Sequence, residues 1–160
     1  MDSQITFDYS NVGQLLSKKV QENSNKTFLI CPGKKTDEFT YLEFKSLVDK
    51  TIKFLKHIDL KKNDKIALIF HNSPEFLILY FAGLTMGLTI VPINPDMAQR
   101  EIKFIIENSK SNAVFYVDKL ESKINEISNF YDKIKFKKIE SINDLALSNE
   151  DKLEIQNIRF

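Results

Sequence analysis

The residues that could carry out chemistry are few in this sequence. His57 and His71 are its only histidines, and Cys31 is its only cysteine. These residues do not form a cluster with metal-ligand spacing, and the sequence holds no glycine-rich phosphate-binding motif and no G-x-S-x-G motif. Because no histidine is near Cys31 in sequence, we interpret this cysteine as a small apolar residue and not as a nucleophile. His57 ends a lysine-rich helical segment, where a cation interacts favourably with the helix dipole.

Two other positions follow apolar runs that have the character of buried strands. His71 and Asn72 come after the first run, and Asp118 comes after a later one. The carboxyl ends of parallel strands form the edge at which open α/β sheets bind ligands, so His71 could touch a ligand there and Asp118 could bind ribose or magnesium. A loop residue and a helix cap are the more common uses of these residue types. We therefore assign no catalytic, cofactor-binding or metal-binding residue.

The elements that must position these residues alternate along the second part of the chain. Continuous apolar runs, typical of parallel strands covered on both faces, are separated by segments long enough for helices. The expected strands are 66–70, 89–91, 113–117 and the alternating 134–139, which should lie nearer a sheet edge. This pattern predicts an α/β fold with a largely parallel, doubly wound sheet and flanking helices.

A helix–hairpin–helix segment precedes the sheet. Thr40 and Glu43 fit a capping box at the start of its second helix. The expected elements are helices at 11–22 and 41–57 and short strands at 27–31 and 38–41. The 160 residues are the size of one domain, or of one lobe of something larger. We expect a single unit over 1–160, with this segment at 1–62 and the sheet at 63–160.

Particular residue types mark where the later elements begin and end. Asn63 tolerates a left-handed backbone in the turn before the first sheet strand. Ser73 with Pro74 fits a helix start, and Gly87 fits the end of the same helix. The next helix, to about residue 108, is expected to be capped by Asp96 and Gln99, with an inward face of Ala98, Ile102, Ile105 and Ile106.

The segment 76–91 is almost wholly apolar, but it is shorter than the roughly 20 residues that span a bilayer. We interpret it as a buried helix followed by a strand, and the chain as not transmembrane. The helix could line an acyl pocket, although core packing is the default. Its side chains expected to be covered by protein are Phe76, Tyr80, Phe81 and Leu84. A short helix at 141–147 and an alternating tail at 153–160, poorly anchored or paired with another chain, are expected to follow.

Composition narrows the class of protein. The chain is 42% hydrophobic and carries 23 basic against 22 acidic residues, a formal charge of +1. Only two of the basic residues are arginine, the side chain that reads phosphate and guanine bidentately, so nucleic-acid binding is not expected. A single cysteine and an N-terminus without the features of a signal peptide indicate a cytoplasmic protein.

The order of five short segments resembles a known family. The chain is similar to the N-terminal part of the AMP-forming adenylating enzymes, which include acyl-CoA synthetases, luciferases and the adenylation domains of peptide synthetases. The segments that carry this resemblance, within roughly residues 10 to 140, are 39–44, 63–68, 72–76, 82–87 and 91–95. One departure is that Asn63 precedes Asp64 where the family usually has glycine. Asparagine retains the left-handed option, so the turn need not change.

The resemblance implies a reaction and also a truncation. The family joins a carboxylic acid to ATP, forming an acyl-adenylate and pyrophosphate, and then usually a thioester. ATP, Mg²⁺ and coenzyme A or a carrier thiol are therefore implied for the full-length enzyme, whereas no cofactor is expected in this fragment. The family's phosphate-binding loop should begin soon after Phe160. The resemblance thus implies a scaffold that needs the remainder of the synthetase chain and is inactive alone.

Two other functions stay open at this point. The chain could be a stand-alone, non-catalytic α/β module that binds a partner and derives from the same family. Reading the gene downstream of Phe160 discriminates this from the ligase fragment, because only the ligase continues into a loop rich in Gly, Ser and Thr. An unrelated flavodoxin-like domain ranks last, because the segment after the first sheet strand, 71–74, offers only caps and no phosphate loop.

Overall fold

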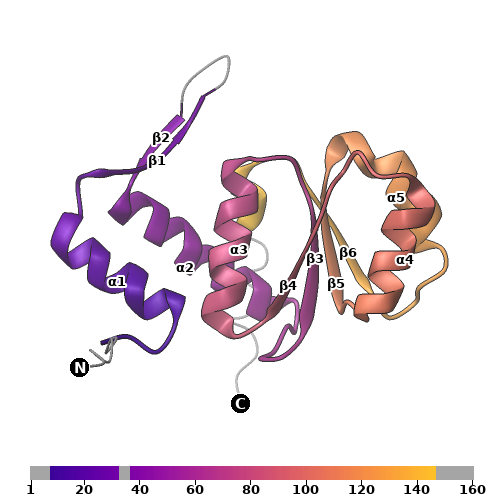
Figure 1. Ribbon diagram of the computed structural model, residues 1–160, viewed down its shortest axis with the longest axis horizontal. Helices are drawn as coiled ribbons and strands as arrows, with labels where there is room; N and C mark the ends of the chain where they lie inside the picture. The colour runs from indigo at the N-terminus through magenta and orange to yellow at the C-terminus, as the bar shows by residue number, and fades with distance from the viewer. Residues whose placement is uncertain (1–7, 33–36, 147–160) are drawn as a thin grey trace, which may run out of the picture.

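The computed structural model describes residues 8–32 and 37–146, which form a sheet with helices on both faces and a separate two-stranded ribbon (Figure 1). The sheet has four parallel strands in the order β4-β3-β5-β6. Their bounds are β3 (Lys65–Ile69), β4 (Thr89–Ile93), β5 (Ala113–Val117) and β6 (Lys135–Ile139). The parallel sheet is confirmed, and β6 lies at an edge as its alternating pattern predicts.

Helices cover both faces of this sheet, so the doubly wound fold is confirmed. Alternate residues of β3 point to opposite sides: Ile66 and Leu68 join one core cluster, and Ala67 and Ile69 join the other. The helices on the first face are α2 (Tyr41–His57) and α3 (Pro74–Met86). On the second face lie α4 (Gln99–Ser109) and α5 (Glu121–Ser128), as Figure 1 shows.

The expected helix–hairpin–helix segment is present before the sheet. α1 (Val12–Asn23) packs on α2 and α3, and β1 (Thr27–Cys31) pairs antiparallel with β2 (Asp37–Thr40). The capping box is confirmed: the Thr40 N–H donates to Glu43 Oε2 at 2.9 Å, and the Glu43 N–H donates to Thr40 Oγ1 at 3.2 Å. The hydrogen bond from the Thr40 backbone holds the pKa of Glu43 below its ordinary value.

The turn residues around α3 also match the sequence. The Phe76 N–H donates to Ser73 Oγ at 3.3 Å, so Ser73 caps the helix. Gly87 ends it with a φ of 74°, and Asn63 has a φ of 73° before β3. The Asn63 N–H donates to the Gly87 carbonyl at 2.9 Å, which ties the two left-handed residues together.

The start of α4 differs from the expectation. Neither Asp96 nor Gln99 caps the helix; its N-cap is Ala98, which has no side-chain acceptor. The Ala98 N–H instead donates to Glu101 Oε2 at 2.8 Å. The Asp96 N–H donates to Asn94 Oδ1 at 2.9 Å, so Asp96 belongs to the preceding turn and lies too early to cap. Ala98, expected to point inward, is exposed because it precedes the first helical turn.

The α3 helix packs against the protein core as expected, but its burial is uneven. The four side chains expected to be covered are all half-buried, namely Phe76, Tyr80, Phe81 and Leu84. The fully buried residues are Ile78, Leu79, Ala82 and Gly83. A helix with apolar residues on every side carries no periodic signal that identifies its inward face. No helix in the part of the chain that the structure describes is both long enough and apolar enough to cross a membrane.

The last described elements are short. The helix expected at 141–147 is a 3₁₀ turn, Ile142–Leu145, capped by Ser141 and Asp144. A further 3₁₀ turn, Asp118–Leu120, leads from β5 into α5. The tail at 153–160, for which weak anchoring or pairing was expected, lies outside the described residues.

Candidate functional site

The loop between β3 and α3 lines three adjacent cavities at the carboxyl edge of the sheet. Phe70 and His71 border a cavity of about 400 Å³ toward β5 and another of about 440 Å³ toward the end of β4. Asn72 and Ser73 border a third, of about 480 Å³, toward the β1–β2 ribbon. This loop is therefore the place in the described structure where concave surface and the predicted ligand-touching residues coincide.

Strand order explains why these residues meet. β3 lies between β4 and β5, so the chain leaves β3 toward one neighbour and later returns to the other side. Such a reversal leaves a crevice outside the carboxyl ends of the strands. His71 follows β3, Asp118 follows β5, and both line the 400 Å³ cavity with Phe70 and Glu75. The sequence placed each residue at the edge, and the structure brings the two into one cavity.

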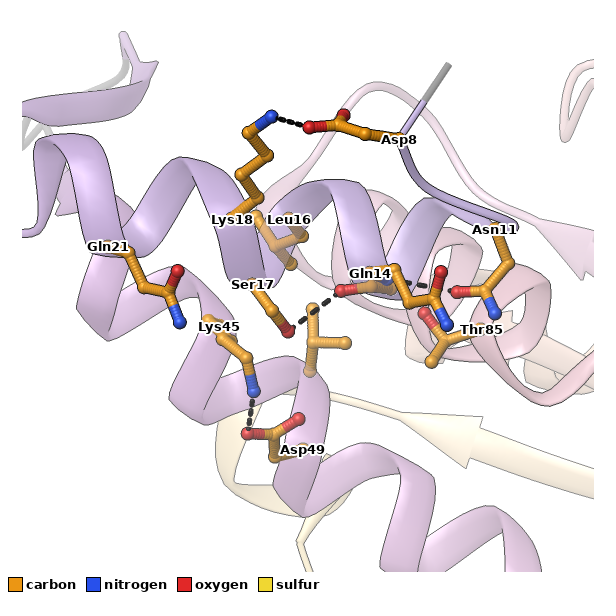
Figure 2. A pocket seen from close by; sticks show the side chains of 12 residues that line it. Asp8, Asn11, Gln14, Leu16, Ser17, Lys18, Gln21, Lys45, Asp49 and Thr85 are labelled. Atoms are coloured by element: carbon orange, nitrogen blue, oxygen red, sulfur yellow. Dashed lines mark hydrogen bonds and ion pairs between the residues drawn. The ribbon is translucent and has the colours of Figure 1, made fainter. Parts of the chain in front are cut away.

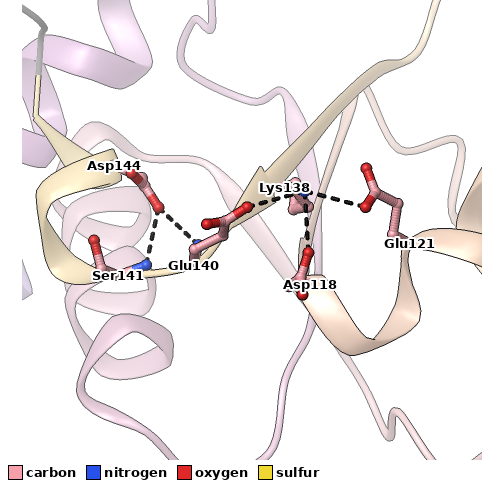
Figure 3. A network of polar contacts seen from close by, with 6 residues as sticks. All are labelled: Asp118, Glu121, Lys138, Glu140, Ser141 and Asp144. Carbon is pink, nitrogen blue, oxygen red and sulfur yellow. Dashed lines mark hydrogen bonds and ion pairs between the residues drawn. The ribbon is translucent and has the colours of Figure 1, made fainter.

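Asp118 is engaged by a lysine. Lys138 Nζ lies 3.0 Å from Asp118 Oδ1, 3.1 Å from Glu121 Oε2 and 2.9 Å from Glu140 Oε1 (Figure 3). The hydrogen bonds to Glu140, Asp118 and Glu121 raise the pKa of Lys138, and the bond to Glu140 has the largest effect. The Lys138 network thus joins the ends of β5 and β6 to the start of α5. The positive charge of Lys138 is paired with carboxylates of the same protein.

The Lys138 network could not be found from the sequence, where Lys137 and Lys138 have the character of a solvated edge. The two side chains alternate along β6: Lys137 is exposed, whereas the Lys138 side chain is 29% exposed. The available signal was that Lys138 precedes the last residue of its strand, at the same edge as Asp118.

His71 makes only a loose contact. Its Nε2 lies 3.6 Å from Asp96 Oδ1, and the two side chains are 65% and 74% exposed. A pair this exposed contributes little to stability. The position agrees with the interpretation of His71 as a loop residue before a capped helix. His57, in the last turn of α2, lines none of the three cavities.

The cavity beside the ribbon has a different character. Leu29, Ile30 and Cys31 of β1 form one wall, and Phe76 and Leu77 of α3 form the other. Cys31 is half-buried among these apolar side chains, and no histidine lines the cavity. This apolar setting agrees with the interpretation of Cys31 as a small apolar residue.

A larger groove, of about 620 Å³, runs between α1 and α2 and lies away from the carboxyl edge (Figure 2). Most of its polar side chains are engaged within the protein. Ser17 Oγ donates to the Gly13 carbonyl at 2.9 Å, and Lys45 Nζ pairs with Asp49 at 2.6 Å. Lys18 likewise pairs with Asp8. We interpret this groove as a contact between helices, because its described residues present no set of groups that converges on a ligand.

The charges at the carboxyl edge do not suit a triphosphate. The two cavities on either side of His71 are lined by four carboxylates and one lysine: Glu75, Asp96, Asp118, Glu140 and Lys119. Lys138 is already held by three carboxylates. Within 8–32 and 37–146, no group of three His, Cys, Asp or Glu residues is placed to hold a metal ion. The arrangement has the character of a scaffold edge.

The fold and this edge define the class: a doubly wound α/β unit of the kind that forms the N-terminal part of adenylate-forming enzymes. The family model described as "AMP-binding enzyme" matches residues 16–157. The chain therefore belongs to the AMP-binding enzyme family, and it corresponds to an N-terminal portion of such enzymes.

Known relatives are longer than this chain. The crotonobetaine/carnitine–CoA ligase of Escherichia fergusonii is 33% identical over 89 residues, which are 54% of this chain and 17% of the ligase. The crystal structure of the N-terminal domain of FACL13 from Mycobacterium tuberculosis matches with a TM-score of 0.78 and 25% identity, over 89% of this chain and 38% of that one. The anthranilate–CoA ligase AuaEII matches in fold, with a TM-score of 0.78 at 19% identity, over 91% of this chain and 28% of its own.

Proposed function

We propose that this chain is the N-terminal scaffold portion of an ATP-dependent, AMP-forming acid–thiol ligase of the acyl-CoA synthetase type, inactive by itself. The observation that carries the proposal is the family match over residues 16–157, in a chain of which 89 residues align with only 17% of a CoA ligase. In this proposal ATP, Mg²⁺ and coenzyme A, or a carrier thiol, are bound with residues that follow Phe160. The acid substrate binds there too, and the enzyme works in the cytoplasm.

The charges of the carboxyl edge support the inactivity of this portion. Adenylation needs donors and a cation fixed around the triphosphate, and a group that orients the carboxylate. The nearest strong candidate, Lys138, is held by Asp118, Glu121 and Glu140. The described residues do not fit a triphosphate, and we assign no catalytic step to them. Their proposed role is to form the core against which the nucleotide-binding segments are positioned.

We also propose that residues 1–62 and 63–160 are two segments of one unit. The support comes from the first core cluster, which contains Leu16 and Phe44 from the first segment together with Leu79 and Phe115 from the second. Separation of the two segments would expose this cluster to water.

A second candidate is a stand-alone, non-catalytic module that docks to a partner chain. The observation that favours it is the half-buried apolar surface of α3, because uncovered apolar surface of this kind marks interaction sites. Its partner would then be a separate protein, whereas the ligase proposal requires the rest of the same chain.

Pyrophosphate release tests both candidates. The 160-residue chain and the chain extended to the natural stop codon are each assayed with ATP, Mg²⁺, coenzyme A and a panel of fatty, aryl and amino acids. The ligase proposal expects background release from the shorter chain and acid-dependent release from the longer one. Acid-dependent release from the 160-residue chain that is lost on mutation of His71 or Asp118 would contradict the inactivity. A stop codon directly after Phe160 and an inactive chain would favour the docking module.

A further inference from the structure

Part of the surface of α3 is apolar but only partly covered. Ile78, Leu79, Ala82 and Gly83 are buried against the rest of the protein. The neighbouring positions are equally apolar, yet the described residues cover them only in part and leave them half-buried: Phe76, Leu77, Tyr80, Phe81, Leu84 and Met86. A helix that is apolar all round is normally buried on every side. α3 thus has the composition of a central helix and the cover of a peripheral one.

Aromatic rings extend this surface onto the ribbon. Phe76 lies 5.9 Å from Tyr80, Tyr80 lies 6.5 Å from Phe81, and Phe81 lies 6.1 Å from Phe28 of β1, measured between ring centroids. All four rings are half-buried. Ile30 on the same strand is 56% exposed and lines the 480 Å³ groove with Phe76. We define the α3–β1 surface as these five side chains and the groove between them.

We propose that the α3–β1 surface is an internal interface, covered by the part of the same polypeptide that follows the described residues. This inference rests on the proposed function. Its argument is one of length: 89% of this chain accounts for only 38% of the solved N-terminal domain of FACL13. A domain of that kind therefore contains more protein than this chain supplies, and its core must continue from an apolar face.

Chemistry selects this face over the others. Among the described residues that line the groove between β1 and α3, Cys31 is the only ionisable one and most of the others are apolar, so the groove fits an apolar segment. The carboxyl edge carries carboxylates, and the edge strand β6 exposes Lys137. The outer side of α4 carries Arg100, Glu101 and Glu107, all exposed. Burying charges of this kind without partners would be costly, whereas burying the α3–β1 surface is favourable.

Labelling of the single cysteine tests the proposal. Cys31 lies in the groove, so thiol alkylation is compared in the 160-residue chain and in the chain extended to its stop codon, with the modified Cys31 peptide counted by mass spectrometry. We expect the rate to fall by about tenfold or more in the longer chain, because alkylation then requires local opening. Hydroxyl-radical footprinting should show the same protection at Phe76 and Tyr80. Phe104 and Phe130, which are 64% and 66% exposed and lie on the α4–α5 side, should react equally in both chains.

A pair of variants gives a second readout. Ile30→Glu should leave the melting temperature of the 160-residue chain unchanged but lower that of the longer chain or prevent its folding. Phe130→Glu, at a similarly exposed position on the opposite side, should behave alike in both chains. Should the longer Ile30→Glu chain fail to fold, the footprint of the unmutated chain still decides the question.

The proposal and the ligase function can fail separately. A longer chain that releases pyrophosphate but labels Cys31 at the same rate as the short one keeps the function and overturns the interface. A longer chain that is inactive yet protected at Cys31 and Phe76 keeps the interface and removes the function. Protection of the 160-residue chain that increases with its concentration would identify a second copy as the occupant and overturn the proposal, as would a stop codon directly after Phe160.

Discussion

The two helical layers that cover the sheet differ in how completely their apolar side chains are buried. In α4, Ile102 and Ile106 are buried against the sheet, and Glu101 and Glu107 face water. This helix needs one neighbour and has it. In α3, apolar residues continue around the whole helix, but only one side is buried. α4 thus leaves one large apolar side chain, Phe104, exposed, whereas α3 leaves several neighbouring apolar side chains half-buried.

The difference teaches how to read cover from composition. A helix in an outer layer places its apolar residues in one stripe, because its other side meets water. A helix that is apolar on all sides is normally in contact with protein on more than one side. The α1 helix supplies part of this cover at Gly13, which packs directly on Thr85 of α3. Phe28 and Phe44 cover part of Phe81, and the described residues leave the outer apolar side chains of α3 half-buried.

The largest expected effect is the difference in stability cost between removing a fully buried ring and a half-buried ring of the first layer. Phe44 is fully buried and lies 5.2 Å from Phe81, ring to ring, at 90°. We expect Phe44→Ala to cost about 3–5 kcal/mol of unfolding free energy in urea, as for other buried phenylalanines. Phe81→Ala should cost clearly less, because half-burial removes less apolar area from water. Equal costs would show that Phe81 is as well covered as Phe44 and would break the comparison.

The next effect tests the one place where α3 has a close outer neighbour. A Cβ added at Gly13 would overlap Cγ2 of Thr85 and lie 2.9 Å from its Oγ1. Thr85 Oγ1 donates to the Phe81 carbonyl at 2.7 Å, which keeps this side chain from turning away. Gly13→Ala should therefore destabilise the protein by about 1–2 kcal/mol, although alanine favours helix. Adding Thr85→Ala should recover most of the loss, and strict additivity in the double-mutant cycle would contradict the contact.

The helix starts of the two layers form a matched pair with a smaller effect. Thr40→Ala removes a side-chain acceptor from the start of α2. In a urea titration it should lower the free energy of unfolding by about 1 kcal/mol. Ala98→Ser supplies the acceptor that α4 lacks, at a residue whose backbone is already extended. That substitution should raise stability by about 0.5–1 kcal/mol, measured in the same denaturant titration. A loss on Ala98→Ser would mean that the turn before α4 has no room for the hydroxyl.

The smallest effect is a pH dependence confined to the first layer. The hydrogen bond from the Thr40 backbone lowers the pKa of Glu43, so the ionised carboxylate is favoured in the folded state. Its contribution is complete above the ordinary value of 4.5 and is lost as the pH falls through the lower, folded-state pKa. Glu43→Gln should thus narrow the stability difference between neutral and acidic pH. An unchanged difference would show that the capping carboxylate is not linked to folding.

Local chemistry explains which parts of the fold were predictable. The Thr40–Glu43 box, the Ser73 cap and the left-handed Asn63 and Gly87 depend on residues close in sequence, and all four are present. The start of α4 was misassigned because two polar residues flanked the true N-cap, Ala98. A sequence rule that looks for a side-chain acceptor at the N-cap cannot find this helix start. Here the only side-chain bond comes from the third helical residue, since Glu101 accepts from the Ala98 N–H.

The site was predictable only in part, for a different reason. That His71 and Asp118 lie at the carboxyl edge follows from their places after apolar strands. That they share one cavity depends on β3 and β5 being neighbours, which the strand order decides. The Lys138 network depends further on β6 lying beside β5, which brings Asp118 and Glu121 to an amine 20 and 17 residues away in sequence. Contacts of this kind are products of topology and leave no local pattern.

The position of β3 in the middle of the sheet also matters while the chain is being made. β3 is the first sheet strand to leave the ribosome; β4 then pairs with it, β5 pairs with its other side, and β6 pairs with β5. Every strand thus finds its partner already synthesised, and the sheet can widen outward without waiting for a later segment. Vectorial synthesis favours such an order, because domains generally fold as their chains emerge. In the folded sheet, the strand that is synthesised first, Lys65–Ile69, lies between two neighbouring strands.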